Sequence, residues 1–302
     1  MTKNYEIIDD IILETDKEDS KIIVVYKPTI EEKNFLVDVL NINKNTIESC
    51  LDPDEVSRVD VCDEYISVMC KIPKNKSAEE NIFNVTTFGI FLFSKNLLIL
   101  SMENVSLFDN KQIIAKNLKE VFLKVLDQPT LSFTENLKII SIISEEIEEK
   151  INESMENKFL INMFTLEKSL VYYLSSLNEN MLVFEKLKTL EEKLELNTAE
   201  KNLLIDYRIE CGQCYKQAEI HSNILASLMD ARVSIVSNNL NILMKTLTKI
   251  TIMIMLPSLV VSIFSMNVRI PVAIYPDAFW GIMILAFLSV LTAIIFWKVR
   301  RW

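Results

Sequence analysis

The sequence predicts an α+β membrane protein in which an N-terminal α/β domain is followed by long helices and two C-terminal transmembrane helices. Three observations predict this order. Short apolar runs alternate with polar breaks through residues 1–130. No proline lies between Pro129 and Pro257, in a stretch rich in Leu, Ile, Glu and Lys that is typical of long helix. Two segments without charge and of membrane length, Ile250–Val268 and Ala278–Trp297, lie near the end of the chain.

Residues 1–130 are predicted to form the cytoplasmic α/β domain. Thr29, followed three residues later by Glu32, forms a capping box that predicts the start of a helix. Gly89 lies inside a predicted strand, where it indicates either a β-bulge or a close approach of another chain segment. Runs rich in β-branched and aromatic residues predict four strands: Ile22–Tyr26, Tyr65–Ile72, Asn84–Phe93 and Asn96–Leu100.

Breaks in the same domain are predicted from turn residues. Asp52-Pro53-Asp54 is expected to interrupt the chain, and the polar residues Lys74–Asn81 are expected to form a loop. The whole chain holds only three glycines and no Gly-rich phosphate loop, which argues against a nucleotide-binding fold.

Long helices are predicted for residues 131–196, and a stalk helix for residues 197–249. Ser154–Asn157 is a candidate turn within the first of these regions. Asn197 with Glu200 three residues later predicts an N-cap. A helix from Thr198 to Met266 would be about 100 Å long, so a stalk would protrude from the membrane.

The predicted membrane hairpin consists of helix 250–268, an outer loop at 269–277 and helix 278–297. Lys245 and Lys249 precede the first segment, and a basic tail at residues 298–302 follows the second. This charge bias predicts that both termini are cytoplasmic, in a multi-pass protein of the plasma membrane. Pro257 is expected to kink or loosen the first membrane helix unless neighbouring groups satisfy the freed carbonyl.

Small polar and sulfur-bearing residues follow one face of the stalk and of the first membrane segment. Steps of three and four keep residues on one side of a helix, and their alternation is the repeat of helices packed around a common axis. A polar face in an uncharged membrane segment indicates a lining for water or ions, with close helix packing through small residues as the alternative. We call these eleven positions the seam: Asp230, Ser234, Ser237, Asn241, Met244, Thr248, Thr251, Met255, Ser258, Ser262 and Ser265.

Composition excludes several other functions. The formal net charge of −10 argues against nucleic acid as a partner. The N-terminus has no secretory signal pattern, and the five scattered cysteines are interpreted as reduced thiols. Cys211, Cys214 and His221 could share a helix face as metal ligands, but no fourth ligand is evident, which favours packed helix residues. No nucleophile, base and acid occur at useful spacing, so an enzyme is not expected.

Three stretches together resemble the CorA family of divalent-cation channels, and the resemblance covers nearly the whole chain. They are Glu48–Val59 in the soluble domain, Val236–Lys245 before the membrane and Phe264–Asn267 at the end of the first crossing. The resemblance implies a homopentamer with a funnel-shaped cytoplasmic domain of αβα layers, in which the long helix continues as the pore-lining crossing. It also implies transport of Mg²⁺, with Co²⁺, Ni²⁺ or Zn²⁺ as further candidate ions and no organic cofactor.

The resemblance also assigns roles to single residues. Ser265, Met266 and Asn267 occupy the place of the Gly-Met-Asn outer loop of the family, whose Asn holds a hydrated cation. Because Gly tolerates conformations that Ser does not, the change to Ser265 predicts altered selectivity, a different gate or lost transport. A membrane-anchored sensor with this fold therefore stays an alternative. The implied pore lining is Asn241, Met244 and Leu247 at the inner constriction, Met255 and Ser258 at the middle, and Thr248, Thr251 and Ser262 between and beyond them.

Three acidic residues complete the implied sites. Asp230 resembles the acidic ring at the cytoplasmic entrance, and Asp206 resembles the carboxylate that binds regulatory Mg²⁺ between subunits. Asp277 is the acid of the outer loop. The resemblance implies that falling internal Mg²⁺ releases the subunits and opens the pore, because facing carboxylates repel without a bridging ion. For Asp206 and Asp230 the alternative is a solvated helix face.

Overall fold

The computed structural model describes residues 2–17, 20–74, 83–103, 114–153, 157–266, 268 and 277–300. The chain divides into two compact units, Met1–Met229 and Asp230–Trp302, each of which is described separately below. The predicted loop at Lys74–Asn81 and the predicted turn at Ser154–Asn157 lie largely outside the described residues.

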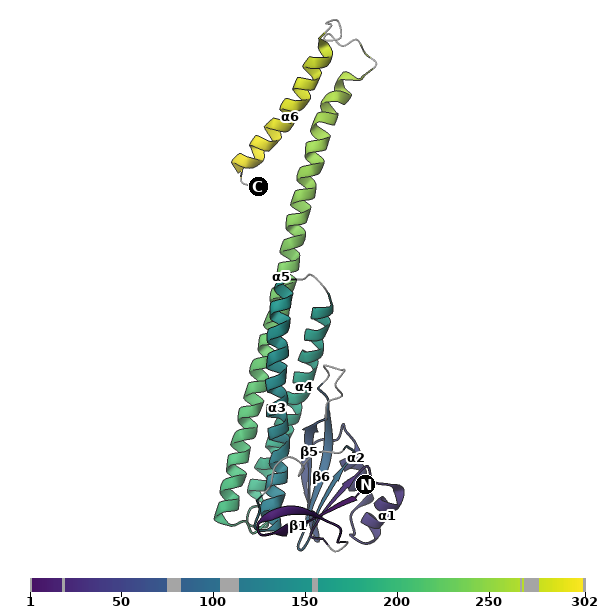
Figure 1. Ribbon diagram of the computed structural model, residues 1–302, viewed down its shortest axis with the longest axis vertical. Coiled ribbons are helices and arrows are strands. Elements are labelled where there is room, and N and C mark those ends of the chain that lie inside the picture. The colour runs from purple at the N-terminus through teal and green to yellow at the C-terminus, as the bar shows by residue number, and fades with distance from the viewer. Residues whose placement is uncertain are drawn as a thin grey trace. The chain divides into compact units, whose positions relative to one another are not determined.

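A seven-stranded mixed sheet forms the centre of the first unit (Figure 1). The strand order is β2-β1-β3-β7-β6-β5-β4, with β3 and β7 parallel and the other neighbours antiparallel. All four predicted strands are confirmed. The strands are β1 (Thr2–Ile8), β2 (Ile11–Thr15), β3 (Ile22–Tyr26), β4 (Arg58–Val61), β5 (Tyr65–Pro73), β6 (Val85–Phe93) and β7 (Leu97–Ser101).

One face of the sheet is covered by two short helices, α1 (Ile30–Asp38) and α2 (Lys44–Leu51). The predicted capping box is confirmed: the Thr29 hydroxyl accepts from the Glu32 amide at 3.2 Å, and the Glu32 carboxylate accepts from the Thr29 amide at 2.8 Å. α2 ends at Leu51, where the break at Asp52-Pro53-Asp54 was predicted. Apolar side chains from both helices and from the central strands form a core on this face.

Gly89 lies where α2 closely approaches the sheet, and it does not form a β-bulge. Its pairing with Met69 on one side and Leu100 on the other is regular. A Cβ atom added to Gly89 would lie 2.2 Å from the sulfur of Cys50, so α2 packs directly against the backbone of β6.

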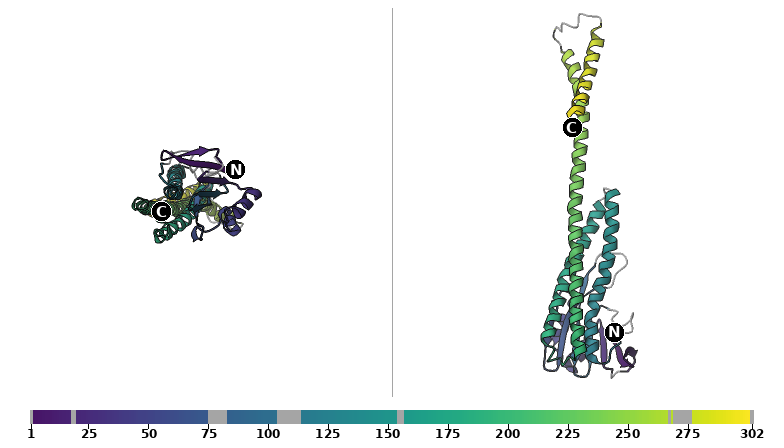
Figure 2. Two further views of the ribbon diagram at one scale, coloured as in Figure 1. Left: turned by 90° about the horizontal axis from the view of Figure 1, so that it is seen from below. Right: turned by 90° about the vertical axis from the view of Figure 1, so that its left-hand side faces the viewer.

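The other face is covered by α3 (Leu118–Glu153), α4 (Asn157–Thr189) and the beginning of α5 (Thr198–Phe264), which lie side by side (Figures 1 and 2). α3 begins upstream of Pro129, so the predicted boundary at residue 130 falls within a helix. Asn117 and Glu120 cap this start, and Pro129 is accommodated as a residue inside α3. The predicted N-cap of α5 is confirmed, because the Asn197 side chain accepts from the Glu200 amide at 2.9 Å.

The second unit contains the remainder of α5 and α6 (Ala278–Arg300). α5 stays helical through Pro257 and ends at Phe264, four residues before the predicted end of the membrane segment at Val268. α6 begins at the predicted Ala278 and extends three residues beyond Trp297.

Candidate ion pathway

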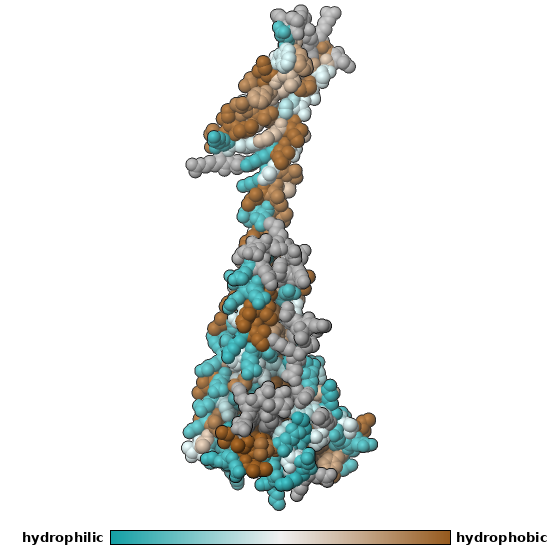
Figure 3. Space-filling model, in the orientation of Figure 1, coloured by the Kyte–Doolittle hydropathy of each residue, from teal (hydrophilic) through white to brown (hydrophobic). Residues whose placement is uncertain are grey.

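In the part of the chain that the structure describes, two helices are long and apolar enough to cross a membrane: α5, over its apolar part, and α6. None of the apolar window of α5 and only 6% of that of α6 is buried within the chain, so neither window belongs to a soluble core. Figure 3 shows hydrophobic residues gathered over the C-terminal half of α5 and over α6. Both helices therefore expose an apolar surface of the kind that lipid or other copies of the chain cover.

All eleven seam residues are described, and all are exposed in the single chain. Leu247, assigned to the inner constriction by resemblance, is also exposed, at 58%. Among the described residues, no part of the same chain covers this face. The structure thus presents the seam to a partner or to solvent, and it places the predicted pore-lining residues along one continuous helix.

The seam hydroxyls are hydrogen-bonded in a common way. Thr248 donates to the Met244 carbonyl at 2.8 Å, Thr251 to the Leu247 carbonyl at 2.9 Å and Ser258 to the Ile254 carbonyl at 2.8 Å. A hydroxyl has one hydrogen and two acceptor lone pairs, so each oxygen retains acceptor capacity outside the helix.

This arrangement matches the outer surface of a hydrated cation. A small divalent cation such as Mg²⁺ gives up its water reluctantly, and the bound waters direct their hydrogens outward. Those hydrogens require acceptors, which Thr248, Thr251 and Ser258 offer along the seam. Sequence reasoning found these residues by their spacing, but the acceptor orientation is visible only in the structure.

The outer end of the pathway is described in part. The Ser265 amide donates to the Val261 carbonyl at 3.0 Å, and its hydroxyl donates to the Ser262 carbonyl at 3.1 Å, which extends the helix end by hydrogen bonding. Ser265 is not among the described residues with positive φ, so its backbone here does not require glycine. Met266 is exposed, and Asn267 lies outside the described residues.

Asp277 precedes α6, and its carbonyl accepts the amide of Gly281 at 3.2 Å. It is exposed at the N-terminal end of the helix, where a carboxylate is favourable to the helix dipole.

Asp206 and Asp230 are both exposed residues of α5, but they belong to different units. Asp206 neighbours Tyr207, whose phenol has a pKa raised by burial and by the carboxylates of Asp127, Glu210, Glu120 and Asp206. The groups around Tyr207 are therefore acidic.

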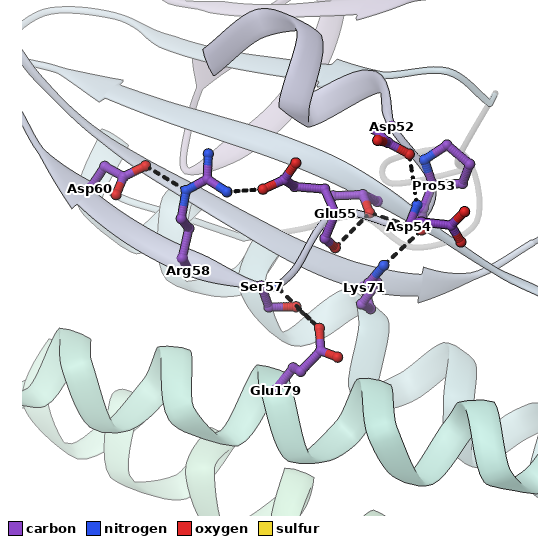
Figure 4. A network of polar contacts seen from close by, with 10 residues as sticks. Asp52, Pro53, Asp54, Glu55, Ser57, Arg58, Asp60, Lys71 and Glu179 are labelled. Atoms are coloured by element: carbon purple, nitrogen blue, oxygen red, sulfur yellow. Dashed lines mark hydrogen bonds and ion pairs between the residues drawn. The ribbon is translucent and has the colours of Figure 1, made fainter. Parts of the chain in front are cut away.

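The family-like stretch Glu48–Val59 includes a loop that hydrogen bonds anchor to the sheet and to α4 (Figure 4). Lys71, which is 6% exposed on β5, donates to the Pro53 carbonyl at 2.7 Å. Burial lowers the pKa of Lys71, although the nearby carboxylates, led by Glu179, oppose this shift. Glu179 of α4 in turn accepts from the Ser57 amide at 3.1 Å.

Cys211 and Cys214 are buried in the core beside α3 and α4, which confirms the packing interpretation. Their thiols are directed at the carbonyls of Leu177 and Thr130, at 3.6 Å and 4.0 Å. Burial raises the pKa of both thiols and lowers that of His221. Within the described ranges, no three His, Cys, Asp or Glu side chains are arranged to hold a metal ion.

Comparison with known proteins places this geometry among transporters. Residues 17–301 match a family described as CorA-like Mg²⁺ transporter protein. The cobalt/magnesium transport protein CorA of Methanocaldococcus jannaschii is 25% identical over 316 residues, covering 100% of this chain and 98% of that protein.

Solved structures have the same fold. The complete structure of the CorA magnesium transporter from Methanocaldococcus jannaschii has a TM-score of 0.84 at 22% identity, covering 98% of this chain and 96% of the other. The full-length CmaX protein has a TM-score of 0.76 at 14% identity, covering 100% and 97%. The αβα layers and the two membrane-length helices are thus the shared architecture.

Proposed function

The chain belongs to the family of CorA-like Mg²⁺ transporters, and from this premise we propose that the seam of α5 lines a pore for hydrated divalent cations, principally Mg²⁺. The observation that carries the proposal is the set of seam hydroxyls whose hydrogens are bonded to their own helix. Their oxygens accept from the waters around the ion, so the ion does not need to lose its water shell. Co²⁺, Ni²⁺ and Zn²⁺ are further candidate ions.

A single α5 cannot enclose a passage, so several copies must turn their seams toward a shared axis. We infer a homopentamer, the number implied by the CorA resemblance. The exposed seam of the isolated chain supports such an assembly. In it, α6 packs outside α5 and faces the lipid of the plasma membrane, and both termini lie in the cytoplasm, as the basic residues flanking the two crossings indicate.

The proposed gate lies near the cytoplasmic end of the crossing. Met244 and Leu247 carry apolar side chains, exposed at 60% and 58%, on the seam side of α5. A ring of such side chains closes a pore by expelling water from it. Asp230 lies at the cytoplasmic entrance, where a ring of carboxylates raises the local concentration of cations.

Regulation is proposed to depend on Asp206. The acidic groups around Tyr207, Asp206 among them, favour a bridging divalent ion between neighbouring copies, and loss of that ion at low internal Mg²⁺ leaves carboxylates that repel. The repulsion opens the assembly.

The test is Mg²⁺ flux into proteoliposomes that contain the full-length protein. Thr251→Val keeps the side-chain shape but removes the acceptor oxygen, and we expect a loss of flux of at least about fivefold, since one hydrogen bond contributes about 1 kcal/mol. Thr292→Val is the matched control, because Thr292 of α6 also donates to its own helix, at 2.8 Å, but lies off the seam. Its flux should equal that of the wild type.

A second readout tests the pore directly. In Thr251→Cys and Ser258→Cys, water-soluble thiol reagents should modify the new cysteines and block flux. If neither cysteine reacts in the membrane, or if Thr251→Val and Thr292→Val behave alike, the seam does not line a pore.

The replacement of the family Gly by Ser265 favours one other candidate, a membrane sensor that does not conduct. It is selected if the wild type passes none of Mg²⁺, Co²⁺, Ni²⁺ and Zn²⁺ while Ser265→Gly does. Flux in the wild type excludes it.

A further inference from the structure

Asp127 is a buried acid without a matching cation. It lies on the face of α3 that packs into the core and is 6% exposed. Its Oδ1 atom is fully buried and has no hydrogen-bond partner in the described part of the chain. A buried acceptor or charge left in this state is costly, so the site requires a partner that protein groups do not supply.

The groups around Asp127 are acidic or neutral. From α5, Glu210 raises the pKa of Asp127, and Tyr207 and Cys211 are the other titratable groups that interact with it. From β5, Cys70 lies beside Cys211 as a buried thiol.

The nearby cations are engaged elsewhere. Lys124, one turn before Asp127 on α3, pairs with Glu120 at 2.7 Å. Arg208 of α5 pairs with Glu185 of α4 at 3.0 Å through a terminal guanidinium nitrogen, while its Nε is buried without a hydrogen-bond partner among the described residues. Within the described residues, no cation contributes to the pKa of Asp127. Neutralisation must therefore come from solution.

Burial, and secondarily Glu210, raise the pKa of Asp127 to about 7. Both causes act against the ionised form, so the neutral acid is the form that the folded protein favours. A neutral carboxyl group carries no charge that burial or Glu210 would disfavour. An ionised Asp127 would instead place two negative charges at the contact of α3 with α5.

We propose that the buried carboxyl group of Asp127 is a proton-binding site at the contact of α3 with α5, which keeps α5 fastened to α3 at neutral and acidic pH and releases it as the cytoplasm becomes alkaline. The proton is taken from water by an Asp127 oxygen, is held there as an O–H group, and returns to water on ionisation. α5 is the helix that continues into the seam, so its release alters the pore. That last consequence rests on the proposed function; the proton site itself does not.

The test of the proton site is hydrogen–deuterium exchange of the full-length protein in nanodiscs across pH 6 to 8, corrected for intrinsic rates. We expect protection of residues 198–225 to fall with a midpoint near pH 7. Infrared spectra should show a protonated carboxyl band at pH 6 that disappears at pH 8. Asp127→Asn, a neutral side chain of the same shape, should abolish both changes and keep α5 protected at pH 8.

Two further variants separate titration from misfolding. Glu210→Gln removes the negative neighbour at an exposed position, so Asp127 should ionise more readily and the midpoint should move to lower pH. Glu135→Gln changes another exposed acid of α3 and should leave the wild-type midpoint. A wild type without a pH-dependent change, or an unmoved midpoint in Glu210→Gln, overturns the proposal.

Flux measurements test the link to transport. If the wild type conducts and its flux depends on internal pH, Asp127→Asn should remove that dependence; equal pH dependence in both proteins refutes the regulatory role. If the wild type passes no cation at any pH, the proposed function fails, and the exchange experiment still decides whether the proton site exists.

Discussion

Replacing Gly89 by alanine tests how closely α2 packs against the sheet. β6 lies between β5 and β7, so its backbone is fixed by pairing on both sides. The added Cβ would lie 2.2 Å from the sulfur and 3.0 Å from the Cβ of Cys50, and 3.3 Å from Cε2 of Phe91. Cys50 and Phe91 are both fully buried, so neither has free space into which it can withdraw. Either the strand or α2 must move.

The magnitude follows from the overpacking of a buried site. Inserting a methyl group into a packed core costs about 1–3 kcal/mol, and the 2.2 Å approach places this case at the upper end. For a unit the size of Met1–Met229, a destabilisation of about 3 kcal/mol lowers the melting temperature by about 6–12 °C. Cys50→Ala removes the sulfur and leaves the 3.0 Å contact with the Cβ of residue 50 and the 3.3 Å contact with Phe91, so Gly89→Ala/Cys50→Ala should be more stable than Gly89→Ala.

The assay is thermal unfolding of the full-length protein in detergent, followed by circular dichroism. The three tryptophans, Trp280, Trp297 and Trp302, all lie in the second unit, so their fluorescence monitors that unit separately. Hydrogen exchange in β5, β6 and β7 localises the effect to the sheet. Gly212→Ala is the matched control, because a Cβ there meets nothing within 4 Å and alanine favours the helix by up to about 1 kcal/mol.

Two results would refute this reasoning. One is a melting temperature for Gly89→Ala equal to that of the wild type. The other is a double variant no more stable than Gly89→Ala, since the two sites should couple by about 1 kcal/mol or more if they are in contact.

Two further predictions concern the loop anchor and the proposed sensor. Asn180→Ala should destabilise the first unit by about 2–4 kcal/mol in the same melts. The Asn180 side chain accepts from the Lys71 amide at 2.9 Å and donates to the Lys71 carbonyl at 2.8 Å, so the variant would leave both buried backbone groups unsatisfied. An unchanged melting temperature would show that water replaces these bonds. Asp206→Lys should abolish the inhibition of flux by internal Mg²⁺ in proteoliposomes, because an ammonium group cannot share a divalent ion; unchanged sensitivity excludes Asp206 as the sensor.

The sequence predicted the central strands because strands buried on both faces are nearly continuous apolar runs, as in β5 and β7. It missed β1, β2 and β4, which lie at or near the sheet edges and are only partly buried. The turn between β1 and β2 carried a usable signal: Asp9 and Asp10 both have positive φ, as a two-residue hairpin turn requires, and Asp tolerates that conformation better than most residues.

Pro129 misled the prediction of where α3 begins. Long helix was predicted only for the proline-free span between Pro129 and Pro257, which placed the boundary near residue 130. The apolar face of α3 continues on both sides of Pro129, with Phe122 and Phe133 both fully buried in the same core. Tertiary packing outweighed the lost backbone hydrogen bond.

The functional residues also include some that the sequence predicts and some that only the structure identifies. The seam was found from sequence because it is a periodic pattern in one helix, whereas Asp127 and Glu210 lie 83 positions apart on α3 and α5. Nothing in the residues near Asp127 indicates that its carboxyl is buried. That fact depends on how α5 packs against α3, which is a tertiary property.

The exposure pattern of α5 extends the seam beyond the range found from sequence. Continuing the alternation of three and four residues backward from Asp230 leads to Asp206, and every position on this path is exposed: Asp206, Ile209, Gln213, Lys216, Ile220, Asn223 and Ser227. The buried residues of the same helix segment follow a different face: Leu204, Cys211, Cys214, Ala218 and Leu225. One face of α5 therefore packs on its own unit, and the other is left for neighbouring copies.

This division also constrains how copies of α5 assemble. A straight helix drifts by about 20° per heptad from a strict seven-residue repeat. From Asp206 to Ser265 the seam spans eight heptads and three residues. If straight helices had their seams in contact at one end, each seam would be rotated away from the shared axis by about 160° at the other end. Either the helices wrap around each other with a left-handed twist, or they contact one another over only part of their length. If the helices contact one another over only part of their length, Asp206 and Thr251 cannot both face the shared axis directly. A divalent ion at Asp206 would then bind at the boundary between neighbouring copies, where the proposed gating requires it.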